Sequence, residues 1–162
     1  MEKNVTELST SARRVQDAIV SAGLDCCVVE LPASTRTAQE AADAVGCTVG
    51  QIVKSLVFRG KQSGKGIFVA ASGANRVNEK RFKEYAGEGI EKASPEFVRE
   101  ITGFAIGGVS PVGHLQAMES YIDEALLGYA ELWAAAGTPN AVFRLSPSDL
   151  VHLTAGRVVS IA

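Results

Sequence analysis

The hydrophobic and polar positions along the chain follow two periods, one typical of helices and the other of strands. Segments with apolar residues at three- and four-residue spacing predict helices, and the first of these ends at Gly23. Short runs that are apolar on both faces predict buried strands. The predicted helices cover residues 6–22, 37–46, part of 74–85, 94–103 and 146–154. The predicted strands cover residues 26–31, 51–59, 67–71, 104–106, 117–122, 132–136, 141–145 and 158–161.

Two pairs of neighbouring strands are joined by short polar turns that contain glycine, at residues 60–66 and 137–140. Both pairs are therefore predicted to form hairpins. Helices mixed with hairpins predict an α+β fold. A chain of 162 residues with 46% hydrophobic content can bury one core, so we expect a single domain over residues 1–162.

Composition and charge argue against several classes of protein. The net charge of −2 lacks the basic surplus of a nucleic-acid-binding domain, so DNA is not an expected partner and any RNA contact needs a local basic patch. Cys26, Cys27 and Cys47 match neither a disulfide framework nor a zinc site, and no metal or cofactor is expected. No apolar run is long enough to cross a membrane, and the N-terminus lacks a secretory core. We therefore expect a cytoplasmic protein.

Residues 107–114 form a loop whose main chain, rather than its side chains, is the candidate chemistry. Its glycines let another molecule approach the backbone, while Pro111 fixes its own φ and moves Ser110 out of the helical region. We expect the strand at 104–106 to end in this rigid loop, with N–H groups directed at a ligand. A Cβ at Gly108 would then intrude on the ligand, so Gly108→Ala is expected to cost activity more than stability. The alternative is an ordinary tight turn between two strands.

Lys54 is a charge in the middle of the apolar strand predicted over residues 51–59. Strand alternation places it on the same side as Leu56 and Phe58, where an unpaired ammonium is costly. We expect the side chain to reach a pocket, an anion or a carboxylate. The alternative is a lysine near a strand end that extends its amine to solvent.

These two segments resemble the YbaK/EbsC family, the free-standing relatives of the editing domain inserted in bacterial prolyl-tRNA synthetases. The motifs are Gln-Ile-Val-Lys-Ser-Leu-Val-Phe at residues 51–58 and Gly-Gly-Val-Ser-Pro-Val-Gly at residues 107–113. The resemblance continues in residues 37–42, 120–127 and 145–150, and covers nearly the whole chain. It implies the fold of that family, a curved, barrel-like mixed sheet surrounded by helices.

The resemblance also implies a trans-editing hydrolase that deacylates mischarged aminoacyl-tRNA, of the tRNA(Pro) type or a related one. The implied partners are the acceptor end of a charged tRNA and an aminoacyl-tRNA synthetase that delivers it. Lys54 and the loop at 107–114 match the site of that family. The chain departs from the type that acts on Cys-tRNA(Pro) at Gly113-His114-Leu115, which leaves the amino acid open.

Hydrolysis of an aminoacyl ester needs a stabilised oxyanion and an activated water. We expect water to attack directly, with the N–H groups of Gly107 and Gly108 at the oxyanion and Lys54 at the terminal adenosine, its phosphate or the carbonyl. An acyl-enzyme on Ser110 is not expected, because Pro111 removes an N–H that the oxyanion hole would need. The candidate catalytic residues are Lys54, Gly107, Gly108, Ser110 and His114. The candidate substrate-binding residues are Val109, Pro111, Gly113 and Asp123.

For two of these candidate residues, His114 and Asp123, a structural role is an alternative to the functional one. His114 is either a base or donor, given its near-neutral pKa, or a residue that hydrogen-bonds the loop. Asp123 matches a recurrent aspartate of the family and pairs either with a loop N–H or with Lys54. A structural role is favoured for Asp123.

A basic run lies within residues 74–85 and is the candidate contact with the tRNA backbone. Its cations outnumber Glu79 and Glu84, and a phosphate contact needs local basicity of this kind. The alternative is a solvated face, which is the commoner meaning of a charge run. The candidate tRNA-binding residues are Arg76, Lys80, Arg81 and Lys83.

Two other functions use the same residues. A module that binds aminoacyl-adenosine or another nucleotide without turnover would need the same loop and lysine. A desolvated Lys54 could also form a Schiff base with a carbonyl substrate. Release of free amino acid identifies the hydrolase, and borohydride trapping identifies the Schiff base.

Overall fold

The computed structural model describes residues 8–162, in which one mixed sheet of eight strands is surrounded by five α-helices. The helices are α1 (Thr10–Ser21), α2 (Ala38–Val45), α3 (Glu79–Ala86), α4 (Pro95–Thr102) and α5 (Pro147–Thr154), with 3-10 turns η2 (Val49–Gln51) and η3 (Glu124–Gly128). The strands are β1 (Val28–Glu30), β2 (Ile52–Gly60), β3 (Gly66–Ser72), β4 (Ile90–Lys92), β5 (Glu119–Asp123), β6 (Leu132–Ala135), β7 (Ala141–Leu145) and β8 (Arg157–Val159). The predicted α+β class is confirmed.

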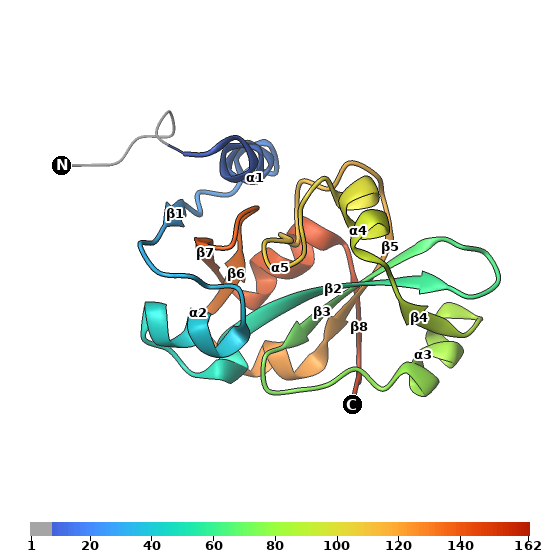
Figure 1. Cartoon of the computed structure of the whole chain (residues 1–162). Coiled ribbons are helices and arrows are strands. Elements are labelled where there is room, and N and C mark those ends of the chain that lie inside the picture. The colour runs from blue at the N-terminus through green and yellow to red at the C-terminus, as the bar shows by residue number, and fades with distance from the viewer. Residues whose placement is uncertain (1–7) are drawn as a thin grey trace.

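The sheet has the strand order β1-β7-β6-β2-β3-β5-β8, and β4 also pairs with β2. Both predicted hairpins are present, β2 with β3 and β6 with β7. The pairs β2–β6, β3–β5 and β5–β8 are parallel. Figure 1 shows the long β2–β3 hairpin crossing the molecule, with α1 and α2 near one end and α3 and β4 near the other. On the β2 side that faces away from β3, two different strands pair with opposite ends of β2.

The centre of the sheet is covered on both faces. On one face Val53 and Val57 of β2 pack with Phe68 and other residues of the larger core. On the other face Phe58 packs with Phe82 in a second core. Strand alternation therefore holds along β2, and it directs Lys54 toward the second face.

Helix boundaries follow their predicted caps. Thr37 accepts from the Glu40 N–H at 3.1 Å, and the Glu40 carboxylate accepts in return from the Thr37 N–H, which completes the predicted capping box of α2. The predicted first helix begins at Thr10, and residues 6 and 7 of that prediction lie outside the described residues. Helix α5 ends at Thr154, and its C-cap is Ala155, with a left-handed φ of 51°, in place of the predicted stop at Gly156.

Two predictions from local pattern were wrong. Residues 104–106 are not a strand: the α4 cap Gly103 has a φ of 80°, and the Thr102 hydroxyl then accepts from the Phe104 N–H at 3.0 Å, which turns the chain into a loop. Phe104 is buried whereas Ile106 is 56% exposed, so the apolar run is divided between core and surface. Strand β4 was missed because it has three residues and forms through its pairing with β2.

Candidate functional site

A cleft of about 640 Å³ lies along the side of β2 that faces away from β3. Strand β6 pairs with β2 at Ile52 and Val53, and β4 pairs with it from Phe58 onward, so the cleft opens between these two strands. Its other walls come from residues 35–38 before α2, from the loop at 106–109, and from the segment before α3. The site is thus built on a rigid strand and enclosed by loops.

Lys54 lines this cleft and is half-buried. Its ammonium donates a hydrogen bond to the main-chain oxygen of Asn75 at 2.5 Å. Burial lowers the pKa of Lys54, the neighbouring Arg76 lowers it further, and Asp123 opposes the change. The side chain thus reaches a pocket, as expected, while its protein hydrogen-bond partner is a carbonyl.

Asp123 is 2% exposed and lies behind Lys54 rather than in the cleft wall. Its Oδ2 accepts from the Ser72 N–H at 3.0 Å and from the Asn75 side-chain amide at 2.9 Å. Its Oδ1 accepts from the Ala125 N–H at 2.9 Å. Asp123 is therefore hydrogen-bonded to Asn75, whose carbonyl in turn accepts from Lys54.

The first part of the glycine-rich loop reaches the cleft. Gly107 and Val109 line it, and among residues 8–162 their N–H groups have no hydrogen-bond acceptor. Gly107 has a left-handed φ of 96°, and a Cβ there would lie 2.8 Å from Cγ of Arg36. A side chain at position 107 would therefore be strained and would collide with Arg36.

Gly108 lies in the loop but not in the cleft wall. Its N–H donates to the Ala105 carbonyl at 3.0 Å, and its own carbonyl accepts from the Gly137 N–H at 2.9 Å. The main-chain groups of Gly108 therefore join two loops. Gly107 and Val109 are thus the loop residues of the cleft wall whose N–H groups are uncommitted among residues 8–162, and these groups are the candidate donors.

The expectation for Gly108→Ala changes accordingly. A Cβ at this position would lie 2.9 Å from main-chain atoms of Thr138, and backbone cannot move aside as a flexible side chain can. We expect the variant to lose about 1–3 kcal/mol of stability, the usual cost of overpacking. Chemical denaturation would measure this. Gly128→Ala is the matched control, because a Cβ there meets nothing within 4 Å, and equal stability of the two variants would contradict the prediction.

The second part of the loop lies outside the cleft wall and is held by contacts within the protein. Ser110 is fully buried, and its hydroxyl accepts from the Val112 N–H at 3.2 Å. His114 Nε2 lies 2.7 Å from the Ser110 carbonyl oxygen, and the ring packs 5.0 Å from that of Phe68 between centroids. Burial lowers the pKa of His114. The contact between His114 and the Ser110 carbonyl agrees with the interpretation in which His114 hydrogen-bonds the loop. The cleft wall does not include Ser110, Pro111, Gly113 or His114.

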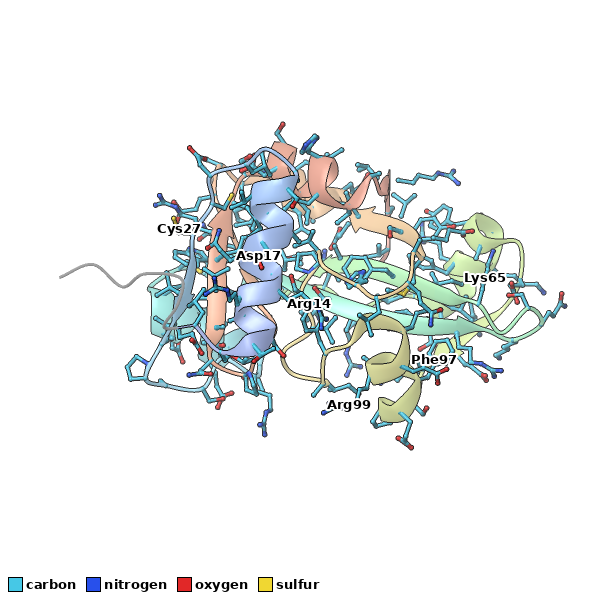
Figure 2. All side chains as sticks on the ribbon, turned by 90° about the horizontal axis from the view of Figure 1, so that it is seen from above. Arg14, Asp17, Cys27, Lys65, Phe97 and Arg99 are labelled. Atoms are coloured by element: carbon cyan, nitrogen blue, oxygen red, sulfur yellow. The ribbon has the colours of Figure 1, made fainter. Side chains whose placement is uncertain are left out.

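Arg14 of α1 holds this part of the loop in place, a role that the sequence did not indicate. Its guanidinium donates to the Gly113 carbonyl at 3.2 Å and to the Thr102 carbonyl at 2.8 Å. It also lies 4.1 Å above the ring of Phe104. Figure 2 shows Arg14 on α1 beside the neighbouring loop, so the N-terminal helix supports the site indirectly.

The cleft walls are cationic although the protein has a net charge of −2. Arg36, Lys54, Arg76 and Lys92 line it, against one described acidic residue, Glu79. Arg36 and Lys92 were missed, because Arg36 lies in a loop without a motif and Lys92 belongs to the unpredicted β4. The other three candidate tRNA-binding residues are exposed on α3, next to this wall: Lys80, Arg81 and Lys83.

Within residues 8–162, no cluster of three or more His, Cys, Asp or Glu side chains could hold a metal ion. Cys26, Cys27 and Cys47 are free thiols. In the same part of the chain, no helix has both the length and the apolar character needed to cross a membrane.

Comparison with known proteins places the chain in a family. A model of the aminoacyl-tRNA editing domain matches residues 32–153. Protein YwhH of Bacillus subtilis, which is uncharacterised, is 32% identical over 131 residues, which cover 81% of this chain and 83% of YwhH. EbsC of Enterococcus faecalis, named as a candidate Cys-tRNA(Pro)/Cys-tRNA(Cys) deacylase, is 26% identical over 125 residues, 77% of this chain and 76% of EbsC.

A solved structure extends this likeness to the whole fold. A candidate trans-editing enzyme for prolyl tRNA synthetase superposes with a TM-score of 0.90 at 54% identity, covering 96% of this chain and 98% of that one. The family match includes Lys54, the cleft-facing Gly107 and Val109, and the basic α3. The chain therefore belongs to the aminoacyl-tRNA editing domain family, which confirms the resemblance to YbaK and EbsC.

Proposed function

We propose that the protein hydrolyses the ester bond of mischarged aminoacyl-tRNA, acting in trans on the acceptor end. One observation carries this proposal: a cationic cleft contains Lys54 together with the uncommitted N–H groups of Gly107 and Val109. Cations suit the phosphates of the terminal nucleotides, and main-chain donors suit the oxyanion of an ester undergoing attack. The names of EbsC and of the solved trans-editing enzyme support the same reaction.

In this mechanism, water adds to the carbonyl carbon of the ester, and the carbonyl oxygen becomes an oxyanion. The N–H groups of Gly107 and Val109 stabilise it, and each such donor is worth about 3 kcal/mol in the transition state. The bond between carbon and ribose oxygen then breaks, and the ribose oxygen takes the proton that the water gives up. Lys54 holds the terminal adenosine or its phosphate, while Asp123 and Asn75 hold Lys54.

The test is the release of free amino acid from a panel of charged tRNAs, each with its uncatalysed rate subtracted. We expect rapid release for a subset of mischarged tRNAs and slow release for correctly charged ones. Tight binding without release for every member of the panel would contradict hydrolysis, and would favour a module that binds aminoacyl-adenosine. Since one solved relative is named as a candidate trans-editing enzyme for prolyl tRNA synthetase, tRNA(Pro) with and without that synthetase belongs in the panel.

Reversal of two charges on α3 is expected to weaken binding of tRNA without changing the chemical step. Lys80 and Arg81 are exposed and directly follow Glu79, a residue of the cleft wall. In Lys80→Glu with Arg81→Glu, each lost contact with single-stranded phosphate should make the negative slope of log affinity against log salt shallower by about 0.7. The Michaelis constant for charged tRNA should rise while kcat stays constant.

The control is a double reversal at exposed cations outside the cleft wall, Lys61→Glu with Arg99→Glu, of which Arg99 is labelled on α4 in Figure 2. It has the same change in net charge, so it separates a local contact from the field of the whole molecule. If both double variants and the wild type share one dependence of rate on salt, α3 is a solvated face.

A further inference from the structure

Within residues 8–162, no strand pairs with the middle of β2 on the cleft side. Strand β6 pairs with β2 at residues 52 and 53, and β4 pairs with it at residues 58–60. Between them, the Ala93 N–H approaches the Val57 carbonyl at 3.4 Å. The main chain at residues 54–56 is therefore an open sheet edge that forms part of the cleft.

The direction of the main-chain groups on this edge follows from the pairing of β2. The Gly60 N–H donates to Lys65 and the Ile52 carbonyl accepts from Gly73, so even-numbered residues direct their polar groups toward β3. Successive residues of a strand alternate in this respect. The N–H and C=O of Ser55 therefore point away from β3 and into the gap.

Ser55 has three polar groups without a partner. Its N–H and C=O take part in neither the β4 nor the β6 pairing, and its buried hydroxyl has no hydrogen-bond partner among residues 8–162. Folded proteins pair nearly all buried polar groups, so the buried Ser55 hydroxyl needs an explanation. Together with the two main-chain groups of Ser55 that open onto the cleft, it points to a ligand.

We propose that Ser55 pairs with the aminoacyl group of the substrate as one residue of an antiparallel strand pairs with the residue opposite. An aminoacyl ester has a hydrogen-bond donor, the α-ammonium, and an acceptor, the carbonyl oxygen, on either side of one α-carbon. A residue in a strand has its N–H and C=O in the same arrangement. The Ser55 carbonyl accepts a hydrogen bond from the α-ammonium, and the Ser55 N–H donates one to the carbonyl oxygen of the ester. That oxygen has a second lone pair for the donors of the loop. This inference rests on the proposed function and deepens it by naming the part of the substrate that the site recognises, the aminoacyl group.

The pairing also fixes where the substrate side chain lies. Residues opposite each other in an antiparallel pair place their side chains on the same face of the sheet. On the Ser55 face the cleft is lined by Val53, Val57, Val98 and Val109. The substrate class is therefore an L-aminoacyl ester with a compact side chain, which would lie beside the Ser55 hydroxyl. A D-aminoacyl group with the same pairing would direct its side chain to the face of Lys54.

Ser55→Pro tests the main-chain contact directly. Proline removes the N–H, and it is tolerated where that N–H faces outward from a sheet edge, as it does here. Ser55→Ala is the matched control, because it keeps the main-chain groups and removes the hydroxyl. The substrates are three esters of one tRNA. They carry the L form of the amino acid that the panel identifies, its D form, and the corresponding carboxylic acid that lacks the α-amino group.

For the wild type we expect the rate enhancement over uncatalysed hydrolysis to be at least about tenfold larger for the L-ester than for either of the others. This is the factor that corresponds to one hydrogen bond to a charged group. Ser55→Pro should lose about tenfold or more on the L-ester and should no longer distinguish the three esters. Ser55→Ala should keep the preference for the L-ester over the other two. If Ser55→Pro fails to fold by thermal denaturation, the wild-type rate enhancements on the three esters still decide.

Equal wild-type rate enhancements on the L-ester and the ester without the amino group would overturn the pairing while leaving hydrolysis established. A folded Ser55→Pro with the wild-type profile would do the same. Absence of hydrolysis for every charged tRNA would overturn the proposed function, and the pairing with it.

Discussion

Lys54→Ala is expected to lower kcat/KM for deacylation by about 100-fold or more while the protein remains folded. The effect is of the size seen when a preorganised electrostatic contact to the transition state is removed. Stability should change little, because the variant loses one hydrogen bond to Asn75 but also removes a half-buried charge from an apolar strand. Turnover and the thermal midpoint are measured on the same preparations.

Lys92→Ala is the matched control, since Lys92 is an exposed lysine of the same cleft wall. Its loss should cost much less. Burial lowers the pKa of Lys54. If the charged form of Lys54 acts in the reaction, the wild-type rate should fall as pH rises through that lowered pKa, at a lower pH than for a free lysine. Unchanged turnover in Lys54→Ala would remove this residue from the site. A borohydride-trapped adduct would instead support the Schiff base.

Local sequence predicted those parts of the fold that local interactions decide. The capping box at Thr37 and Glu40, the two hairpins, and the alternation that places Lys54 all depend on residues close together in the chain. Lys54 was identified for a physical reason, a charge where burial disfavours one. These features could be read without knowing which strands are neighbours.

The shape of the cleft depends on strand order, which local pattern does not contain. The gap beside Ser55 exists because β6 and β4 pair with opposite ends of β2. From the sequence, Gly107 and Gly108 of the loop were predicted to have the same role. In the structure, Gly108 is hydrogen-bonded to both Ala105 and Gly137. The placement of Ser110 and His114 outside the cleft wall likewise depends on contacts between distant segments, such as Arg14 with Gly113 and Phe68 with His114.

Asp123→Ala is expected to have the largest effect on stability, about 3 kcal/mol or more. The carboxylate accepts hydrogen bonds from the Ser72 N–H, the Asn75 amide and the Ala125 N–H, and it is 2% exposed. Each buried donor that is left without an acceptor costs about 1–3 kcal/mol. Water could enter the space left by the side chain and recover part of this cost.

The same variant should also lose deacylation, since Asn75 is freed and its carbonyl no longer holds Lys54. Asp149→Ala is the control: Asp149 caps α5 by accepting from the Ser146 N–H, so its loss should cost about 1 kcal/mol and leave kcat unchanged. Rates are compared well below both thermal midpoints, where each variant is folded. If Asp123→Ala then retains wild-type kcat, the chain of contacts from Asp123 through Asn75 stabilises the fold without positioning Lys54.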